Sequence, residues 1–187
     1  MSTEVKLKEV RLAFPVLFTP TKFDEKDAKA KFRATFLMEP GGANEKAVRA
    51  AMLTEAINLW KDKAKAIIKS LEGQVNKCSF QNGNLKPDLD GYAGMVYLNA
   101  SNAVRPRVVD RDGKTPLGES DGKPYAGCYV NAVVAIAAMT KMGNGIYGYL
   151  KGVQFVKDGD AFGGGAPLAE DAFSDLADTG ADEDLGV

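Results

Sequence analysis

The sequence of 187 residues contains no histidine. This absence excludes the Ser-His-Asp and Cys-His triads, the HExxH zinc sites and the histidine-dependent zinc deaminases, because each of them needs an imidazole. An enzyme built from this chain would have to work with carboxylates, lysine, tyrosine or bound metal ions. The missing histidine therefore favours a binding protein over an enzyme.

Cysteine and long apolar runs are also scarce. The two cysteines, Cys78 and Cys128, form no CxxC pair, which indicates a reducing cytosol and no thiol-rich metal site. The longest apolar run covers only residues 132–139, too few to span a bilayer. The first residues lack the apolar core of a signal peptide. We therefore expect a cytoplasmic protein with no membrane segment, no cofactor and no bound metal.

Basic residues are absent from the end of the chain. Residues 158–187 hold nine acidic residues, which leaves 24 basic and 16 acidic residues in 1–157, a net charge of +8. A basic body with an acidic end is typical of proteins that bind a polyanion. After the glycine triplet 163–165 the apolar side chains are too few for a core. The sequence thus predicts a folded domain over 1–160 and a disordered acidic tail over 161–187.

The tail has two interpretations. It can be a solubilising end, or it can be a docking peptide, since a few apolar groups stand among its acids. For the second interpretation the predicted partner-binding residues are Phe173, Asp175, Leu176 and Asp178.

The hydrophobic pattern of the body is mainly that of β-strands. Alternating apolar residues and turn signals predict strands over residues 5–18, 31–38, 92–101, 104–109, 126–139 and 145–157. A helical stripe covers 44–72, and a loop rich in Asn, Gly, Lys and Asp covers 73–91. Short antiparallel strands with one long inserted helix indicate a small β-barrel.

The period of two also assigns faces. It places Val96 and Leu98 toward the core and Tyr97 and Asn99 on the opposite face. In residues 126–139, Val130 and Val134 point inward and Tyr129 outward by the same rule. In residues 145–157, one side carries Tyr147, Tyr149, Lys151, Phe155 and Lys157.

Two motifs point to other functions and are weighed against simpler explanations. Residues 143–148 match GxGxxG, but a strand pattern follows where a dinucleotide site needs a helix, so a tight turn is expected. Asp110 and Asp112 are able to hold Mg²⁺ in a nuclease or recombination enzyme. Aspartate is also favoured at turns such as Asp112-Gly113, and we take that interpretation first.

Tyrosines and cations are interleaved along the second half of the chain, which holds all six tyrosines. Single-stranded nucleic acid needs this combination, because aromatic faces stack on unpaired bases and cations hold the backbone. The simpler alternative is that tyrosines cover the core with their hydroxyls in water, and for Tyr92 the two interpretations are equally supported. The candidate binding residues are Lys31, Arg33, Tyr92, Tyr97, Asn99, Arg105, Arg107, Arg111, Lys123, Tyr125, Tyr129 and Tyr149.

Four segments, residues 92–102, 105–110, 127–132 and 152–159, resemble a bacteriophage family first catalogued as a domain of unknown function and then identified as single-stranded DNA-binding proteins with an OB fold. The resemblance covers nearly the whole chain. It implies an OB-type barrel, single-stranded DNA binding in phage replication or recombination, and an acidic tail that recruits replication or recombination proteins. It also implies the host cell cytoplasm as location, and it is compatible with a homo-oligomer.

Two other classes compete with this hypothesis. One is the metal-dependent nuclease or recombination enzyme that uses Asp110 and Asp112. The other is a protein-interaction adaptor whose basic body binds an acidic partner.

Overall fold

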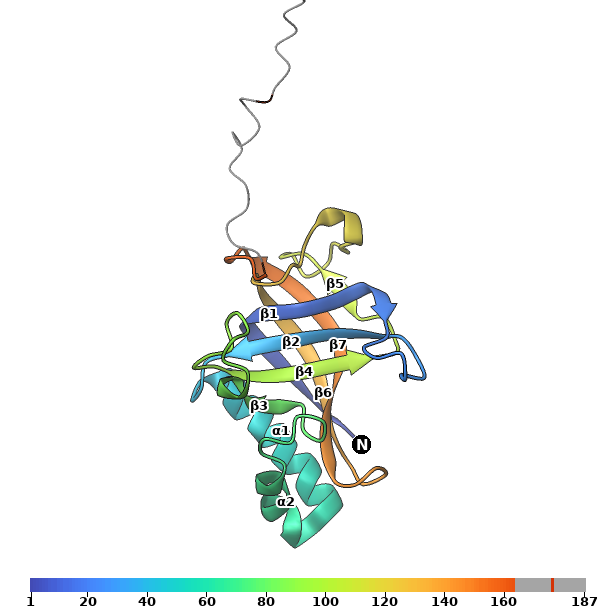
Figure 1. Ribbon diagram of the computed structural model, residues 1–187, viewed down its shortest axis with the longest axis vertical. Helices are drawn as coiled ribbons and strands as arrows, with labels where there is room; N and C mark the ends of the chain where they lie inside the picture. Colours follow the sequence, from blue (N-terminus) through green and yellow to red (C-terminus); the bar gives the residue numbers. More distant parts are fainter. Residues whose placement is uncertain (164–175, 177–187) are drawn as a thin grey trace, which may run out of the picture.

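The computed structural model describes residues 1–163 and Leu176. It consists of β-strands and one helical segment, which lies between the second and the third strand in the sequence (Figure 1). The strands are β1 (Thr3–Thr21), β2 (Lys31–Met38), β3 (Phe80–Asn82), β4 (Val96–Asn102), β5 (Arg107–Val109), β6 (Tyr129–Met139) and β7 (Gly145–Lys157). The helices are α1 (Ala43–Trp60) and α2 (Ala64–Ser70), with single 3-10 turns at η1 (Lys61–Lys63), η2 (Gly83–Leu85) and η3 (Glu119–Asp121).

Five strands close into a barrel. The antiparallel order β4-β2-β1-β6-β7 is completed by a parallel pairing of β4 with β7 at Ser101 and Tyr149. At this closure a Cβ atom on Gly148 would lie 2.6 Å from the Asn99 carbonyl oxygen, so glycine lets the two strands approach. The predicted OB-type barrel with one long inserted helical segment is confirmed.

Strand β1 belongs to both halves of the barrel because it bends twice. Its first half pairs with β6 and its second half with β2, and the register shifts beside Glu9 and Phe14. Both residues have a positive φ, 48° and 47°. Such irregularities bend a strand and increase its twist, which a small closed barrel requires.

The barrel encloses the main core, and a second cluster lies on its outer surface. Alternate residues such as Phe36 and Leu98 point inward and are completely buried. Helix α1 covers one end of the barrel with buried side chains that include Val48. The outer cluster consists of Ala13, Leu37, Tyr92 and Tyr97, and it packs against Leu89 and Phe162.

The helical segment and the long loop differ from the prediction. The predicted continuous helix over 44–72 is interrupted at η1, where Lys61 has a φ of 52° that an α-helix does not allow. The predicted loop over 73–91 contains β3, which pairs with β4. A strand of three residues is too short to show alternation, so the sequence pattern did not reveal it.

The predicted face of β7 is wrong at Phe155, whereas Lys151 and Lys157 are exposed as predicted. The ladder between β6 and β7 shifts by one residue between Val133 and Val134, so that Lys151 is passed over. This bulge changes the phase of alternation. Phe155 is therefore buried in the barrel core and Gln154 faces outward, whereas Tyr147 and Tyr149 lie outside as predicted.

Candidate nucleic-acid interface

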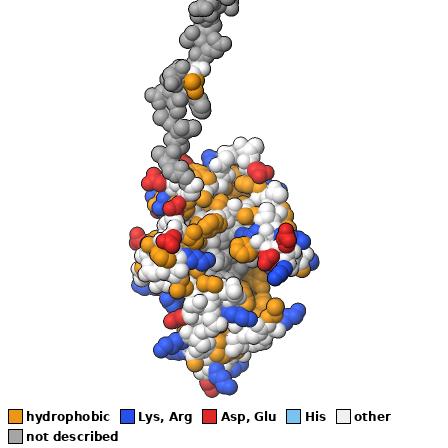
Figure 2. Space-filling model, viewed as in Figure 1, with side chains coloured by type: hydrophobic (Ala, Val, Ile, Leu, Met, Phe, Trp, Pro, Cys, Tyr) orange, Lys and Arg blue, Asp and Glu red, His pale blue; other side chains and the backbone are white. Residues whose placement is uncertain are grey.

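A hollow of about 690 Å³ lies on the outer face of β2 and β4, and we call it the β2–β4 groove. Parts of β1, β7, the turn 22–30 and the segment 75–92 complete its walls. Figure 2 shows this hollowed face, with hydrophobic side chains toward its centre and Lys and Arg around it. In OB barrels the second and third strands and the adjoining loops bind oligonucleotides, and β2 and β4 are those strands here.

Aromatic rings line the groove from several elements. Tyr147 and Tyr149 stand two residues apart on β7 and are half-buried. Phe14 and Phe23 are exposed by 57% and 86% of their surface. The ring of Tyr92 lies edge-to-face with Phe14 at 6.3 Å between centroids. The groove thus offers aromatic surface that unpaired bases can cover.

The charge of the groove is positive. Its basic residues are Lys31, Arg33 and Lys86, and none of the described residues that line it is Asp or Glu. The Arg33 guanidinium lies 5.4 Å from the Phe23 ring centroid and donates a hydrogen bond to the Thr21 carbonyl oxygen at 3.0 Å. These contacts hold a cation beside an exposed ring, the arrangement that binds phosphate next to a stacked base.

The structure brings five of the twelve predicted binding residues into this groove. Lys31, Arg33, Tyr92, Asn99 and Tyr149 all line it. The Thr35 hydroxyl donates to the Asn99 side-chain oxygen at 2.6 Å, which fixes the Asn99 amide there.

Four aromatic or basic lining residues were absent from the predicted set: Phe14, Phe23, Lys86 and Tyr147. Tyr147 could have been included, since it shares the outward period of Tyr149. Phe14 points into the groove from an irregular position of β1, and Phe23 and Lys86 come from turns, where alternation gives no signal.

The prediction that Tyr97 lies on an open face is wrong. Its side chain is completely buried in the outer cluster, with its ring centroid 5.1 Å from that of Tyr92. Alternation correctly placed Tyr97 outside the barrel, but the segment around Leu89 and Tyr92 covers that part of the surface. Burial raises the pKa of both tyrosines, so their hydroxyls stay neutral.

Tyr92 is buried, but in the outer cluster and not in the barrel core. It is only 2% exposed, and what remains accessible forms part of the groove wall.

Four other candidates lie outside the groove, near the start of β6 and the end of β7. Arg111 and Lys123 stand over the Phe155 ring at 5.2 and 4.9 Å from its centroid. The Tyr125 hydroxyl donates to the Asp158 carboxylate at 2.9 Å. Tyr129 has Lys157 over its ring at 5.0 Å. These four residues therefore do not line the β2–β4 groove with Tyr149.

The remaining two candidates follow β4. Arg105 is exposed in the connection between β4 and β5, and Arg107 begins β5 beside a second hollow described below.

The aspartates of the competing enzyme hypothesis are turn residues. The Asp112 carboxylate accepts hydrogen bonds from the backbone N–H groups of Lys114 and Thr115, both at 2.9 Å. Asp110 accepts one from the Arg111 N–H at 2.8 Å and pairs with Lys123 at 3.2 Å. Hydrogen bonds lower the pKa of both carboxyls. The largest effect comes from the Thr115 hydroxyl for Asp112 and from the Arg111 N–H for Asp110.

Within residues 1–163, no group of three or more His, Cys, Asp or Glu side chains is placed to hold a metal ion. The GxGxxG match is also a turn, closed by the Gly143 N–H on the Thr140 carbonyl oxygen at 3.1 Å, and it leads directly into β7. No helix in the described part of the chain is long and apolar enough to cross a membrane.

The last described segment, 158–163, is fixed to the body. Arg11 donates hydrogen bonds to the carbonyl oxygens of Gly127 (3.0 Å) and Asp160 (2.8 Å), and its guanidinium lies 4.3 Å from the Phe162 ring centroid. The Gly163 N–H donates to Asp90 at 2.9 Å. Phe162 and Gly163 therefore contact the body beside the outer cluster.

The predicted partner-binding residues are mostly not placed. Phe173, Asp175 and Asp178 lie outside the described residues, and Leu176 is described and is 73% exposed.

A closed five-stranded OB barrel with an aromatic and basic groove on its second and third strands defines a nucleic-acid-binding protein. The family model described as the single-stranded DNA-binding protein of Enterobacter phage Enc34 matches residues 3–185. The chain belongs to this family of phage single-stranded DNA-binding proteins, which are binding proteins and not enzymes.

One relative and two solved structures extend this comparison. Protein p50 of Acyrthosiphon pisum secondary endosymbiont phage 1 is 40% identical over 176 residues, which are 93% of this chain and 94% of that protein. The Enc34 protein in complex with single-stranded DNA has a TM-score of 0.70 at 23% identity, covering 86% of this chain and 89% of that one. The single-stranded DNA-binding protein gp2.5 of bacteriophage T7 has a TM-score of 0.54 at 12% identity, covering 96% and 97%. Both structures share the fold.

Proposed function

We propose that this protein binds single-stranded DNA in the β2–β4 groove without regard to sequence and without catalysis. The observation that carries the proposal is that aromatic rings and cations line the same groove of an OB barrel, with no acidic residue among the described lining residues. Membership of the phage family and the single-stranded DNA complex of the Enc34 protein support it.

The chemistry of the groove favours single-stranded over double-stranded DNA. The rings of Tyr147 and Tyr149 need the flat face of an unpaired base, which a duplex does not offer. Every base has such a face, so stacking tolerates any sequence. Lys31, Arg33 and Lys86 hold the backbone phosphates.

The biological role we propose is protection and presentation of single strands during phage replication or recombination in the host cytoplasm. The acidic tail supplies a contact for a replication or recombination protein, through Phe173, Asp175, Leu176 and Asp178. The position of Phe162 supports this role, because Phe162 packs against the cluster that contains the groove residue Tyr92.

The salt dependence of binding tests the electrostatic part of the groove. A short oligo-dT of about eight nucleotides, within the range of one OB fold, engages the three groove cations. Since each neutralised phosphate contributes a log-log slope of about −0.7, we expect a slope near −2. Fluorescence anisotropy titrations between low and physiological salt measure it. A slope of zero would remove the cations from the account.

Removal of residues 166–187 is expected to tighten single-stranded DNA binding at low salt. The deleted stretch carries seven acidic residues and no basic ones, and its tether gives it a high concentration near the basic body. This competition is electrostatic, so it fades near physiological salt, where the screening length is about 8 Å. Parallel titrations of the full and shortened chains at two salt concentrations measure the effect.

A variant that keeps the length of the tail but replaces its acids by Asn and Gln is the matched control. We expect it to behave as the deletion does. Equal affinity of all three proteins at low salt would leave the tail as a tether or a solubilising end.

A further inference from the structure

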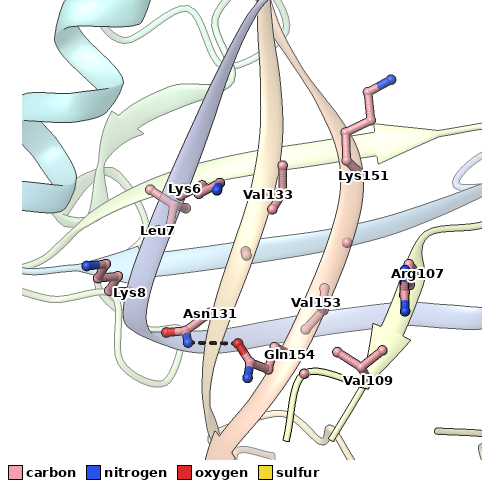
Figure 3. A pocket seen from close by; sticks show the side chains of 13 residues that line it. Lys6, Leu7, Lys8, Arg107, Val109, Asn131, Val133, Lys151, Val153 and Gln154 are labelled. Atoms are coloured by element: carbon pink, nitrogen blue, oxygen red, sulfur yellow. Dashed lines mark hydrogen bonds between the residues drawn. The ribbon is translucent and has the colours of Figure 1, made fainter. Parts of the chain in front are cut away.

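A second hollow, of about 510 Å³, lies on another part of the barrel surface between β1, β6, β7 and β5, and we call it the β1–β5 groove. Lys6 and Lys8 project from β1 on one side, and Arg107 and Lys151 from β5 and β7 on the other (Figure 3). Its floor is apolar apart from Asn131 and Gln154, whose side chains share a hydrogen bond of 3.0 Å. None of its described lining residues is aromatic or acidic.

The four cations of this groove have no anionic partner in the described chain. The ion pairs found within residues 1–163 are Arg49–Glu45, Lys123–Asp110 and Lys157–Glu9, and none involves a cation of the groove. Like charges around one hollow repel each other, and an anion that enters it removes this repulsion. The lack of rings excludes base stacking there, so the groove suits phosphates.

The two grooves meet along β7. Tyr147 and Tyr149 point into the β2–β4 groove, and the next outward residue of the same strand, Lys151, lines the β1–β5 groove. Two residues of a strand span about 7 Å, which places the two grooves within reach of one extended ligand.

The strands that pair with β7 also pass from one groove to the other. β4, which lines the first groove, pairs with β7 at Tyr149, and β5, which lines the second, pairs with it at Gly152. The connection between β4 and β5 carries exposed Arg105, which places another cation beside the junction.

We propose that single-stranded DNA continues from the β2–β4 groove past Arg105 and Lys151 into the β1–β5 groove, where Lys6, Lys8 and Arg107 hold its phosphates. This inference rests on the proposed function, since the first groove must receive the strand. The continuity along β7 favours a DNA strand over an acidic peptide as the occupant. The protein then has a stacking section and a purely electrostatic section in one binding path.

The test uses the full chain, an oligo-dT of about eight nucleotides and one three times as long, with the oligonucleotide in excess so that one protein binds each strand. Seven cations line the two grooves together. At about −0.7 each, the slope is expected to change from near −2 for the short strand to near −5 for the long one. For the variant Lys6→Ala/Lys8→Ala/Lys151→Ala, we expect the slope on the long strand to become less negative by about 2 and the slope on the short strand to stay unchanged.

A matched control removes the same charge elsewhere. Lys63, Lys65 and Lys69 are exposed on the helical segment and line neither groove. Their replacement by alanine is expected to leave both slopes unchanged. An equal loss of slope in this control would mean that only net charge matters, and would overturn the inference.

Other outcomes are equally decisive. If the groove variant binds both strands as the wild type does, or loses affinity for both alike, the second section does not exist. If it binds the long strand normally but no longer binds a synthetic peptide of residues 164–187, the groove is a peptide site. A separate experiment tests the proposed function itself. If a Tyr147→Ala/Tyr149→Ala variant binds the short strand normally, the β2–β4 groove is not the binding site.

Discussion

The double substitution Tyr147→Ala/Tyr149→Ala is expected to weaken binding of short oligo-dT by at least roughly 25-fold. Stacking of a base on an aromatic ring contributes about 1–3 kcal/mol, which corresponds to roughly 5- to 150-fold in affinity for each ring. Both rings line the β2–β4 groove from one strand, so one bound DNA segment contacts both. Anisotropy titration at fixed salt measures the loss.

The matched control is Tyr147→Phe/Tyr149→Phe, which keeps the rings. Within the described chain the Tyr149 hydroxyl makes one hydrogen bond, a weak one to the Met139 sulfur at 3.8 Å, so its removal is expected to change little. Both rings are half-exposed, and the alanine variant is expected to keep most of its thermal stability. A double alanine variant with wild-type affinity would show that the groove is not the binding face.

The substitution Tyr97→Ala is expected to lower the free energy of unfolding by about 3–5 kcal/mol, as for other large buried aromatic residues. Tyr97 is completely buried, and its ring supports Tyr92 and Leu37 in the outer cluster. Urea denaturation measures the change.

Tyr97→Phe provides the contrast. The Tyr97 hydroxyl is buried without a hydrogen-bond partner in the described chain, and such a group costs about 1–3 kcal/mol. Its removal is expected to leave stability unchanged or to raise it. If Tyr97→Ala instead kept its stability and lost DNA affinity, Tyr97 would face the ligand, as the strand period alone suggests.

Much of the fold follows from alternation in the sequence. Residues 31–38 and 145–157 match β2 and β7 because alternate residues of each strand, such as Phe32 and Ala34 or Ile146 and Leu150, point into the barrel core. The closure of the barrel does not follow from it. It depends on a parallel pairing at Ser101 and Tyr149 and on the close approach at Gly148, both of which join residues far apart in the chain.

The sequence identified the groove residues whose exposure follows from the period of two in a β-strand, and it missed those whose exposure does not. Lys31, Arg33 and Tyr149 stand on open strand faces and were identified. Tyr97 stands on the same kind of face but is covered by a loop, which no local pattern reveals. Phe14 lines the groove from a position where β1 has a positive φ and its register with β2 shifts.

The charge pattern identified the class of ligand but not where it binds. A net charge of +8 in residues 1–157 indicated a polyanion. The barrel then distributes the predicted cations over different surfaces: Arg33 in one groove, Arg107 in the other, and Lys123 at the far end of β7. Only the closed topology decides which of them act together.

Photo-crosslinking of a short iodouracil-containing oligonucleotide to the full protein, followed by mass spectrometry of the linked peptides, tests the central claim most directly. The β2–β4 groove predicts crosslinks at its rings, at Tyr147 and Tyr149 on β7 and at Phe14 or Phe23. Crosslinks confined to Tyr125 and Tyr129, at the other end of the strand pair β6 and β7, would contradict it.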